Sequence, residues 1–337
     1  MLYVTTRNKT DAHTAHKTLQ TDRGPDGGLY IPYRLPRLSE DQISSLKDKS
    51  FGQCVADILN LFFSAKLDAL DVDFCVGRYP ARLVSMSHRI VIAETWHNPD
   101  WDFARMVRNL TGRIRATEDS SGSFGNWAWI AIRIAALFAL YGDLLRNNLA
   151  APGQKLDIAV TAGDFSAPMS AWYAREMGLP IGTIICGCDD NSAAWDLLHH
   201  GQLSTNAAES VPSDLERLVF ATLGWEETRR YCEVCQCGGI YTPGEEQLET
   251  LRSGLFAAVV SSKRTESVIR NVYRTNTYLL GPESAIAYGG LQDYRASTGE
   301  AGPALILTER SPICSADAVA KAMGITVREL QDRIGLT

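Results

Sequence analysis

The chain has 337 residues, of which 45% are hydrophobic and 21% charged, and its formal net charge is -6. This composition is ordinary for a folded protein of one or two domains. Nucleic acid and anionic membrane surfaces are poor candidates for partners, because both bind clusters of lysine and arginine and the sequence shows no such cluster.

The start of the chain and its cysteines favour a cytoplasmic location. The first ten residues, MLYVTTRNKT, lack the apolar core of a signal peptide. The longest apolar stretch is interrupted by Arg133 and is short for a bilayer span, so we expect a buried helix over residues 126–145. Eight cysteines without a signal peptide indicate a reducing compartment, in which thiols stay free or bind metal.

The first part of the chain, to about residue 95, mixes turn signals with a helical pattern. Turns are indicated by RGPDGGLYIPYRLP, and a helix is predicted in SFGQCVADILNLFF. The β-branched run at 90–92 suits a strand. Residues 113–125, RIRATEDSSGSFG, are polar and rich in glycine and serine, so we expect a loop or a join there.

The second half of the chain alternates strands and helices more regularly. LDIAVTAG reads as a buried strand, and a helix follows from Ser166, its expected N-cap, to a stop at Gly178-Leu179-Pro180. IGTIICG is the next strand and NSAAWDLLHHG the next helix. The later segments GPALILTE and SADAVAKAMG repeat this order, and TVRELQDRIG near the end is amphipathic. Such βαβ spacing predicts an α/β fold with a parallel sheet covered by helices.

A ligand cleft is expected where the strands of this sheet end. In open α/β sheets, ligands bind at the carboxyl ends of the strands. The loops at residues 162–167, 187–191 and 309–314 should therefore line any cleft.

Several motifs, taken in order, resemble the threonine synthase family. They are LYVTTR, GPDGGLYIP, TAGDFSAPMSAWYAREMGLPI, CDDNSAAWDLLHHGQLST, VPSDLERLVFATLG, YLLGPESAIAYGGL and ALILTERSP, and together they span nearly the whole chain. Members of this family are fold-type-II enzymes that use pyridoxal phosphate to convert O-phosphohomoserine to threonine. The resemblance implies a parallel-sheet core with flanking helices in a reduced fold-type-II architecture.

The resemblance also implies how the chain is organised. Residues 1–112 form an N-terminal region, and residues 126–337 form a large α/β region that packs with the first as one body. Only about twenty residues separate Ala104 from GNWAWIAIRI, which resembles the family's substrate helix. The join at 113–125 would therefore replace a lost small subdomain that closes over the cofactor in the family.

The position of the family's cofactor lysine is occupied by alanine. That lysine follows a His, a Gly-Pro and a Phe, and here His97, Asn98-Pro99 and Phe103 are in register with Ala104 next. A Schiff base needs a primary amine, which a methyl group cannot supply. In the substrate helix, Trp129 takes the place of the arginine that the family offers to the substrate phosphate, which removes a bidentate cation.

The family's other cofactor contacts are altered as well. Its Gly-Asn-aromatic-Gly phosphate loop reads Gly163-Asp164-Phe165-Ser166 here, so a negative charge lies where a dianion would dock. Gly281 and Glu283 replace the acidic and imidazole groups of an Asp-Pro-His motif, and Thr308 matches the hydroxyl placed near the pyridine nitrogen. We therefore expect no pyridoxal phosphate cofactor.

Several other groups of residues are candidates for chemistry. Cys232, Cys235 and Cys237 have a C-x2-C-x-C spacing that could bind zinc or an iron–sulfur cluster, or they are free thiols. The acidic loop with Asp189, Asp190 and Asn191 is either a polar ligand or cation site in the cleft, or an N-cap cluster in which Asp190 or Asn191 caps the next helix.

His199 and His200 point in different directions on a helix, which favours an interaction with the helix dipole over a shared metal. His97, Asp100 and Asp102 could act as an acid/base set, or they serve turn chemistry beside Asn-Pro. Four tryptophans near the lost subdomain either plug its space or form a partner-binding surface: Trp96, Trp101, Trp127 and Trp129.

The sequence thus predicts a threonine-synthase-like homologue that has lost Schiff-base chemistry. It would be a pseudoenzyme acting through a protein partner, or a protein that binds a small amino-acid-like ligand, and a homodimer is compatible with either. The alternative is a lyase or transferase that works without the cofactor lysine and uses His97, Asp100, Asp102 or Asp164. A third reading keeps pyridoxal phosphate bound noncovalently, which the charge of Asp164 disfavours.

Overall fold

A computed structural model of the chain describes residues 1–77, 81–96, 101–118, 126–204 and 213–333. Within these segments the central sheet has six strands in the order β10-β7-β6-β11-β5-β4. Only the edge pair β4–β5 is antiparallel among the pairings of this sheet in the described segments. The strands span Arg82–Ser85 (β4), Ile90–Glu94 (β5), Leu156–Thr161 (β6), Ile181–Cys188 (β7), Leu255–Val259 (β10) and Ala304–Thr308 (β11). The predicted parallel-sheet α/β core is confirmed.

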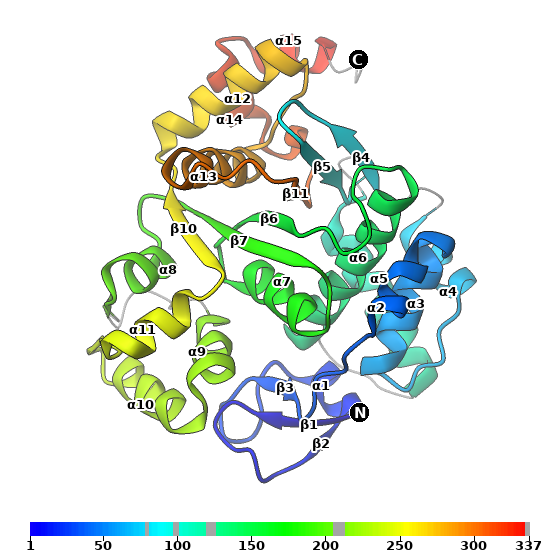
Figure 1. Ribbon diagram of the computed structural model, residues 1–337, viewed down its shortest axis with the longest axis vertical. Helices are drawn as coiled ribbons and strands as arrows, with labels where there is room; N and C mark the ends of the chain where they lie inside the picture. Colours follow the sequence, from blue (N-terminus) through cyan, green and yellow to red (C-terminus); the bar gives the residue numbers. More distant parts are fainter. Residues whose placement is uncertain (78–80, 97–100, 119–125, 205–212, 334–337) are drawn as a thin grey trace.

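Both faces of the sheet are apolar. Alternate residues of each strand point to opposite sides, and the strands carry apolar residues at both sets of positions. On β11, Leu305 and Leu307 belong to one core cluster, whereas Ala304 and Ile306 belong to the other. Helices cover both faces in Figure 1. On one side lie α12 (Ser262–Asn276), α13 (Pro282–Thr298), η3 (Pro312–Ser315), α14 (Ala316–Met323) and α15 (Val327–Arg333), and on the other lie α6 (Asn126–Arg146) and α7 (Ser166–Glu176).

Helix α6 runs through the larger core cluster and packs against α3 and α7. By length and composition the part from Trp127 to Arg146 could cross a membrane, but 89% of its most apolar stretch is buried inside the protein. It is therefore a core helix, as its sequence predicts. Its one buried charge, Arg133, has to be paired inside the protein.

The N-terminal part of the chain forms a small antiparallel sheet and a group of helices beside α6 (Figure 1). Side-chain capping boxes start three of these helices, at Ser39, Ser50 and Asp68. The elements are β1 (Leu2–Thr5), β2 (His13–Thr14), α1 (Ala15–Gln20), β3 (Tyr30–Pro32), α2 (Glu40–Ser44), η1 (Ser45–Asp48), α3 (Phe51–Phe62), α4 (Ala69–Val76) and, after β5, α5 (Phe103–Glu118).

Along the chain, a further group of short elements follows β7 and precedes β10. They are α8 (Ala193–Trp195), η2 (Asp196–His200), β8 (Leu203–Ser204), α9 (Leu215–Leu223), α10 (Trp225–Gln236), β9 (Ile240–Tyr241) and α11 (Glu245–Arg252). A buried carboxylate links this group to the N-terminal part. Glu216 of α9 accepts hydrogen bonds from Arg7 Nε at 3.1 Å and Arg7 Nη2 at 3.0 Å.

Three local predictions are wrong. Helix α5 continues to Glu118, so the first part of the expected loop at 113–125 is helical, because Ile114 and Arg115 are buried on its inner face. The N-cap of α7 is Phe165 in a left-handed conformation (φ 67°), and Ser166 is the first helical residue. The helix after β7 is capped by Ser192, which accepts from Trp195 N at 3.4 Å, rather than by Asp190 or Asn191. The division into regions 1–112, 113–125 and 126–337 stays a prediction.

Candidate functional site

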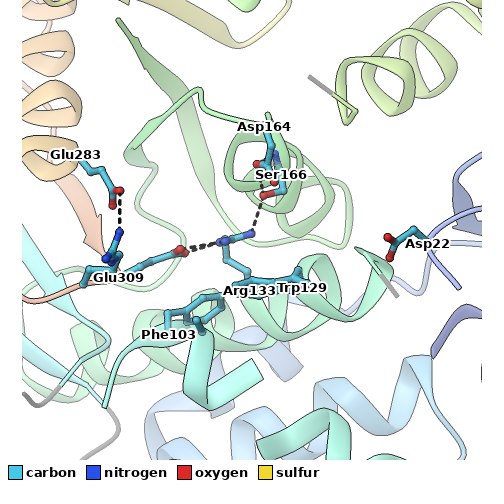
Figure 2. Close-up of a pocket in the computed structure, with 10 residues that line it drawn as sticks. Asp22, Phe103, Trp129, Arg133, Asp164, Ser166, Glu283 and Glu309 are labelled. Atoms are coloured by element: carbon cyan, nitrogen blue, oxygen red, sulfur yellow. Dashed lines mark hydrogen bonds and ion pairs between the residues drawn. The ribbon is translucent and has the colours of Figure 1, made fainter. Parts of the chain in front are cut away.

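A cavity of about 450 Å³ lies at the carboxyl end of the parallel sheet, where the topology predicts a cleft. Its walls come from the loop after β6, the segment after β11 and the first turns of α5 and α13, with α6 beneath them (Figure 2). We call it the site cavity, and its described lining residues are Asp22, Phe103, Ala104, Trp129, Arg133, Asp164, Ser166, Glu283, Glu309 and Arg310.

The floor of the site cavity is an ion pair between Arg133 of α6 and Glu309, which directly follows β11. Arg133 Nε donates to Glu309 Oε1 at 2.5 Å and Nη2 donates to Oε2 at 3.0 Å, a bidentate arrangement. The Arg133 side chain is only 4% exposed. Burial alone lowers the pKa of this guanidinium, but the nearby carboxylates, Glu309 first among them, raise it above its ordinary value. Arg133 is therefore a permanent cation whose charge is matched within the chain.

Aromatic rings complete the floor. Phe103 and Trp129 have ring centroids 6.1 Å apart, and the Arg133 guanidinium carbon lies 4.9 Å from the centre of the Phe103 ring. Ala104 follows Phe103 in the first turn of α5 and also lines the cavity. The side of the cavity formed by α5 is thus apolar at the position where the family resemblance places a lysine.

The Asp164 carboxylate holds the loop after β6 in place through hydrogen bonds within the loop. Asp164 Oδ1 accepts from Ser166 N at 2.9 Å and from Ser166 Oγ at 2.6 Å. Arg133 Nη1 donates to the same Ser166 Oγ at 3.3 Å, which ties the loop to the floor. The predicted residues Asp164 and Ser166 do line the site cavity, whereas Gly163 and the buried Phe165 shape the turn behind them without lining it.

Thr308 is close to the site but its hydroxyl is occupied. Thr308 Oγ1 donates to Ala93 O at 3.1 Å and accepts from Trp96 Nε1 at 3.2 Å. Next to it, buried Glu94 accepts a bidentate contact from Arg82 and a 2.7 Å hydrogen bond from the Tyr278 hydroxyl. Burial and the Glu94 carboxylate raise the pKa of Tyr278, so this network stays protonated at the phenol. Thr308 does not line the site cavity in the described part of the chain.

The rim of the site cavity carries charges that are less tightly held. Glu283 in the first turn of α13 and Arg310 are 3.7 Å apart, and their side chains are 60% and 51% exposed. Asp22 and Asp164 are exposed as well. Figure 2 shows Glu283, Asp164 and Asp22 on different sides of the cavity, with the Arg133–Glu309 pair beneath. Carboxylates thus reach the rim from separate parts of the chain.

The predicted acid/base set is only partly within the described residues. His97 and Asp100 lie outside them. Asp102 Oδ1 accepts from Arg105 N at 2.9 Å, so it caps the start of α5, in keeping with the turn interpretation of its sequence. Arg105 in turn lies over Trp101, with its guanidinium carbon 4.2 Å from the ring centre.

The acidic loop after β7 is not part of the site cavity. Asp189 Oδ1 accepts from Asn191 N at 3.2 Å, and Asp190 Oδ2 accepts from Ser262 N at 3.2 Å at the start of α12. The prediction that Asp189 and Asn191 line the cleft is wrong, because their side chains serve the loop itself and are exposed.

The predicted metal site has no support in the described residues. No group of three His, Cys, Asp or Glu side chains there is placed to hold a metal ion. Cys232 is buried on α10 and Cys235 half-buried, while Cys237 is exposed after the helix ends. Burial raises the pKa of Cys232 to about 12, which disfavours the thiolate that a metal needs.

The two adjacent histidines also differ from expectation. His199 stacks on Trp195, with ring centroids 3.9 Å apart and planes 10° from parallel. Burial lowers the pKa of His199, and the charges of His200 and Arg252 lower it further. Its cationic form is disfavoured, so the predicted charge interaction with the helix dipole is not supported for this residue.

Sequence reasoning missed the residue that organises the site. Arg133 was read only as an interruption of an apolar helix. A single charge among buried apolar residues needs a partner, and that signal predicts a buried ion pair. The chain separates Arg133 from Glu309 by 176 positions, so the sequence does not name the partner.

Comparisons with known proteins agree with the motifs. The family model described as "Threonine synthase N terminus" matches residues 2–78. Threonine synthase of Pseudomonas aeruginosa is 27% identical, with 96% of this chain and 90% of that protein covered. The chain is similar to threonine synthases over nearly its whole length.

Solved structures of this family share the fold. A pyridoxal-phosphate-bound threonine synthase from Brucella melitensis superposes with a TM-score of 0.84 at 21% identity, over 96% of this chain and 92% of that one. Threonine synthase from yeast gives a TM-score of 0.83 at 15% identity, over 100% of this chain and 94% of that one. The aligned region with the Pseudomonas aeruginosa threonine synthase is 431 residues long, which exceeds the 337 residues of this chain by 94.

Proposed function

We propose that this protein is a threonine synthase homologue without Schiff-base chemistry, which binds a small amino-acid-like molecule in the site cavity. The observation that carries the proposal is the absence of an amine. Ala104 occupies the wall of the cavity at the family's lysine position, and none of the chain's eight lysines is among the lining residues, although all eight are described. Imine formation requires an uncharged primary amine within reach of the carbonyl carbon.

The residues present do not fit pyridoxal phosphate in other respects. The first amide of α7, Ser166 N, already donates to the Asp164 carboxylate, which puts a negative charge where a phosphate would need donors. The Thr308 hydroxyl accepts from Trp96, so it is engaged within the chain. The same features argue against noncovalent binding of the cofactor.

The described residues on the floor of the cavity also offer no free cation to a substrate phosphate. Arg133 is engaged by Glu309 on one edge and by Ser166 on another, and Trp129 packs beside Phe103. The length of the alignment with the Pseudomonas aeruginosa relative is in keeping with a missing segment. These points support the proposed loss of both the original chemistry and the original substrate.

A role that runs only through a protein partner is less well supported than ligand binding. The site cavity is open, and its volume of about 450 Å³ falls in the range of small-molecule sites. The proposal includes a cytoplasmic location, in keeping with eight free cysteines.

The proposal is tested by trapping an imine. Purified protein is mixed with pyridoxal phosphate, reduced with borohydride and mapped by peptide mass spectrometry. We expect no visible imine band and only background labelling of surface lysines. The pyridoxal-phosphate-bound threonine synthase of Brucella melitensis is the positive control, and we expect it to show the imine band and one labelled lysine. Stoichiometric labelling of one native lysine, with a band that borohydride bleaches, would overturn the proposal.

A further inference from the structure

We infer that the ligand of the site cavity is a small cationic amine, such as a diamine or a basic amino acid, and not a phosphorylated or acidic one. This inference rests on the proposed function and names its ligand class. It follows from how the charges that line the cavity are paired, from the Trp129 ring on its floor and from the size of the space.

The described lining residues carry more carboxylates than cations. Four are acidic, Asp22, Asp164, Glu283 and Glu309, and two are arginines, Arg133 and Arg310. The bidentate Arg133–Glu309 pair is neutral as a unit, so neither residue attracts a ligand charge strongly. Asp22 has an interaction of its own within the chain, so the charges that remain for a ligand are those of Asp164, Glu283 and the exposed Arg310.

Two of these carboxylates have oxygen atoms that can accept further hydrogen bonds from a ligand. Asp164 uses Oδ1 for Ser166, and its Oδ2 has no hydrogen-bond donor among the described residues. Glu283 lies 3.7 Å from Arg310, beyond hydrogen-bond distance, and both side chains are more than half exposed. An ammonium group has three donors and no acceptor, which suits such oxygens.

These carboxylates do not form an isolated acidic cluster on the surface. They come from the loop after β6 and from the first turn of α13, and both face the same cavity of about 450 Å³. The ring of Trp129, half-buried on α6, lies on the floor beside them, whereas the ring of Phe103 is buried and already has the Arg133 guanidinium over it. The Trp129 ring can attract a cation and pack against the methylene groups of an aliphatic amine.

The same arrangement rejects an anion. A phosphate placed in the cavity would meet Asp164 where the first amide of α7 is already bonded. Its strongest potential partner, Arg133, would have to give up the Glu309 carboxylate, which leaves a buried charge unpaired. Among the described lining residues only Arg310, exposed at the rim, is available to it, so the charge of the cavity selects a cation.

A charge series of ligands tests this inference. Binding of 1,4-diaminobutane, L-lysine, L-homoserine and O-phospho-L-homoserine to the wild-type protein is measured by calorimetry and thermal shift. We expect the diamine and L-lysine to bind and stabilise, L-homoserine to bind weakly, and the phosphorylated compound not to bind. Higher ionic strength should weaken binding of the diamine, because the rim carboxylates are exposed to solvent and their charge is screened by salt.

Variants assign the effect to the named carboxylates. Asp164→Asn keeps an oxygen that can accept from Ser166, and Glu283→Gln changes an exposed side chain, so both should fold. Each should weaken binding of the diamine about tenfold, which is the usual effect of losing one charged hydrogen bond. Glu226→Gln is the matched control, because Glu226 is an exposed first-turn glutamate of α10 away from the cavity, and it should leave binding unchanged.

Three results would overturn the inference. They are binding of O-phospho-L-homoserine that is tighter than binding of the diamine, equal diamine binding in both cavity variants and the control, and no binding of any amine. None of them depends on imine trapping. A cofactor adduct in the wild-type protein would instead overturn the proposed function, so failures of the two proposals are distinguishable.

Discussion

Two consecutive residues after β11 take part in two very different ion pairs. Glu309 holds Arg133 through two hydrogen bonds on the floor of the site cavity, and the arginine is 4% exposed. Arg310 faces Glu283 at the rim, at 3.7 Å and with both side chains more than half exposed. Two ion pairs made by neighbouring residues of opposite charge therefore differ in burial, geometry and expected energy.

The difference separates what the fold needs from what a ligand can use. A buried bidentate pair is expensive to break, because either partner alone is left as an uncompensated charge. An exposed pair contributes little to stability and can exchange its partner for a ligand. The floor of the site cavity is therefore part of the structure, and the rim is where recognition takes place.

Removing the Arg133–Glu309 ion pair should have the largest effect on stability. Arg133→Met keeps the length of the side chain but leaves the Glu309 carboxylate, which is 24% exposed, without its cation, so we expect the free energy of unfolding to fall by about 1.5–3 kcal/mol. Urea denaturation measures it. The double variant Arg133→Met/Glu309→Gln should recover part of the loss, because the stranded charge is gone. A single variant as stable as wild type would contradict the assignment of Arg133 to the fold.

Removing the Ser166 hydroxyl, which joins Arg133 to Asp164, should lower stability by a smaller amount. Ser166→Ala removes the hydrogen bond to Asp164 at 2.6 Å and the one from Arg133 at 3.3 Å. We expect a loss of about 1–2 kcal/mol, since Ser166 is buried and two polar partners lose a bond. Ser170→Ala, one turn along the same helix, is the control. Its hydroxyl donates only to Ser166 O within α7, so its removal should be nearly neutral. Equal losses in the two variants would show that Ser166 does not join the two regions.

The fold could be predicted further than the site. Buried strand patterns and the apolar stretch of α6 are local signals, and they located the parallel sheet and the core helix. The helix at 113–118 was missed because its polar residues outnumber its apolar ones, although Ile114 lies on the buried side. Ala104, Asp164 and Glu283 were located through the family motifs, and all three line the site cavity.

The pairing of charges in the site could not be read from the sequence. Asp164 was predicted to oppose an anion, but its bond to Ser166 depends on the turn made by Phe165 in a left-handed conformation. Thr308 looked like an available hydroxyl, and only the folded chain brings Trp96 to it. In both cases the partner is chosen by tertiary structure, which composition and spacing do not encode.

Breaking the rim pair should hardly affect stability. Arg310→Ala removes an exposed cation 3.7 Å from Glu283, so the expected change is at most about 0.5 kcal/mol. Arg37→Ala is the matched control, because Arg37 is 76% exposed and pairs with Glu176 at 3.5 Å away from the cavity. The two variants should unfold at the same urea concentration as the wild-type protein.

Ligand binding should separate these two variants. Removing Arg310 leaves Glu283 without its competing cation and makes the potential of the cavity more negative, so 1,4-diaminobutane should bind several-fold more tightly to Arg310→Ala than to Arg37→Ala. Calorimetry at low ionic strength measures the ratio. Weaker binding in Arg310→Ala would mean that Arg310 contacts the ligand itself, and the rim would then recognise an anionic group.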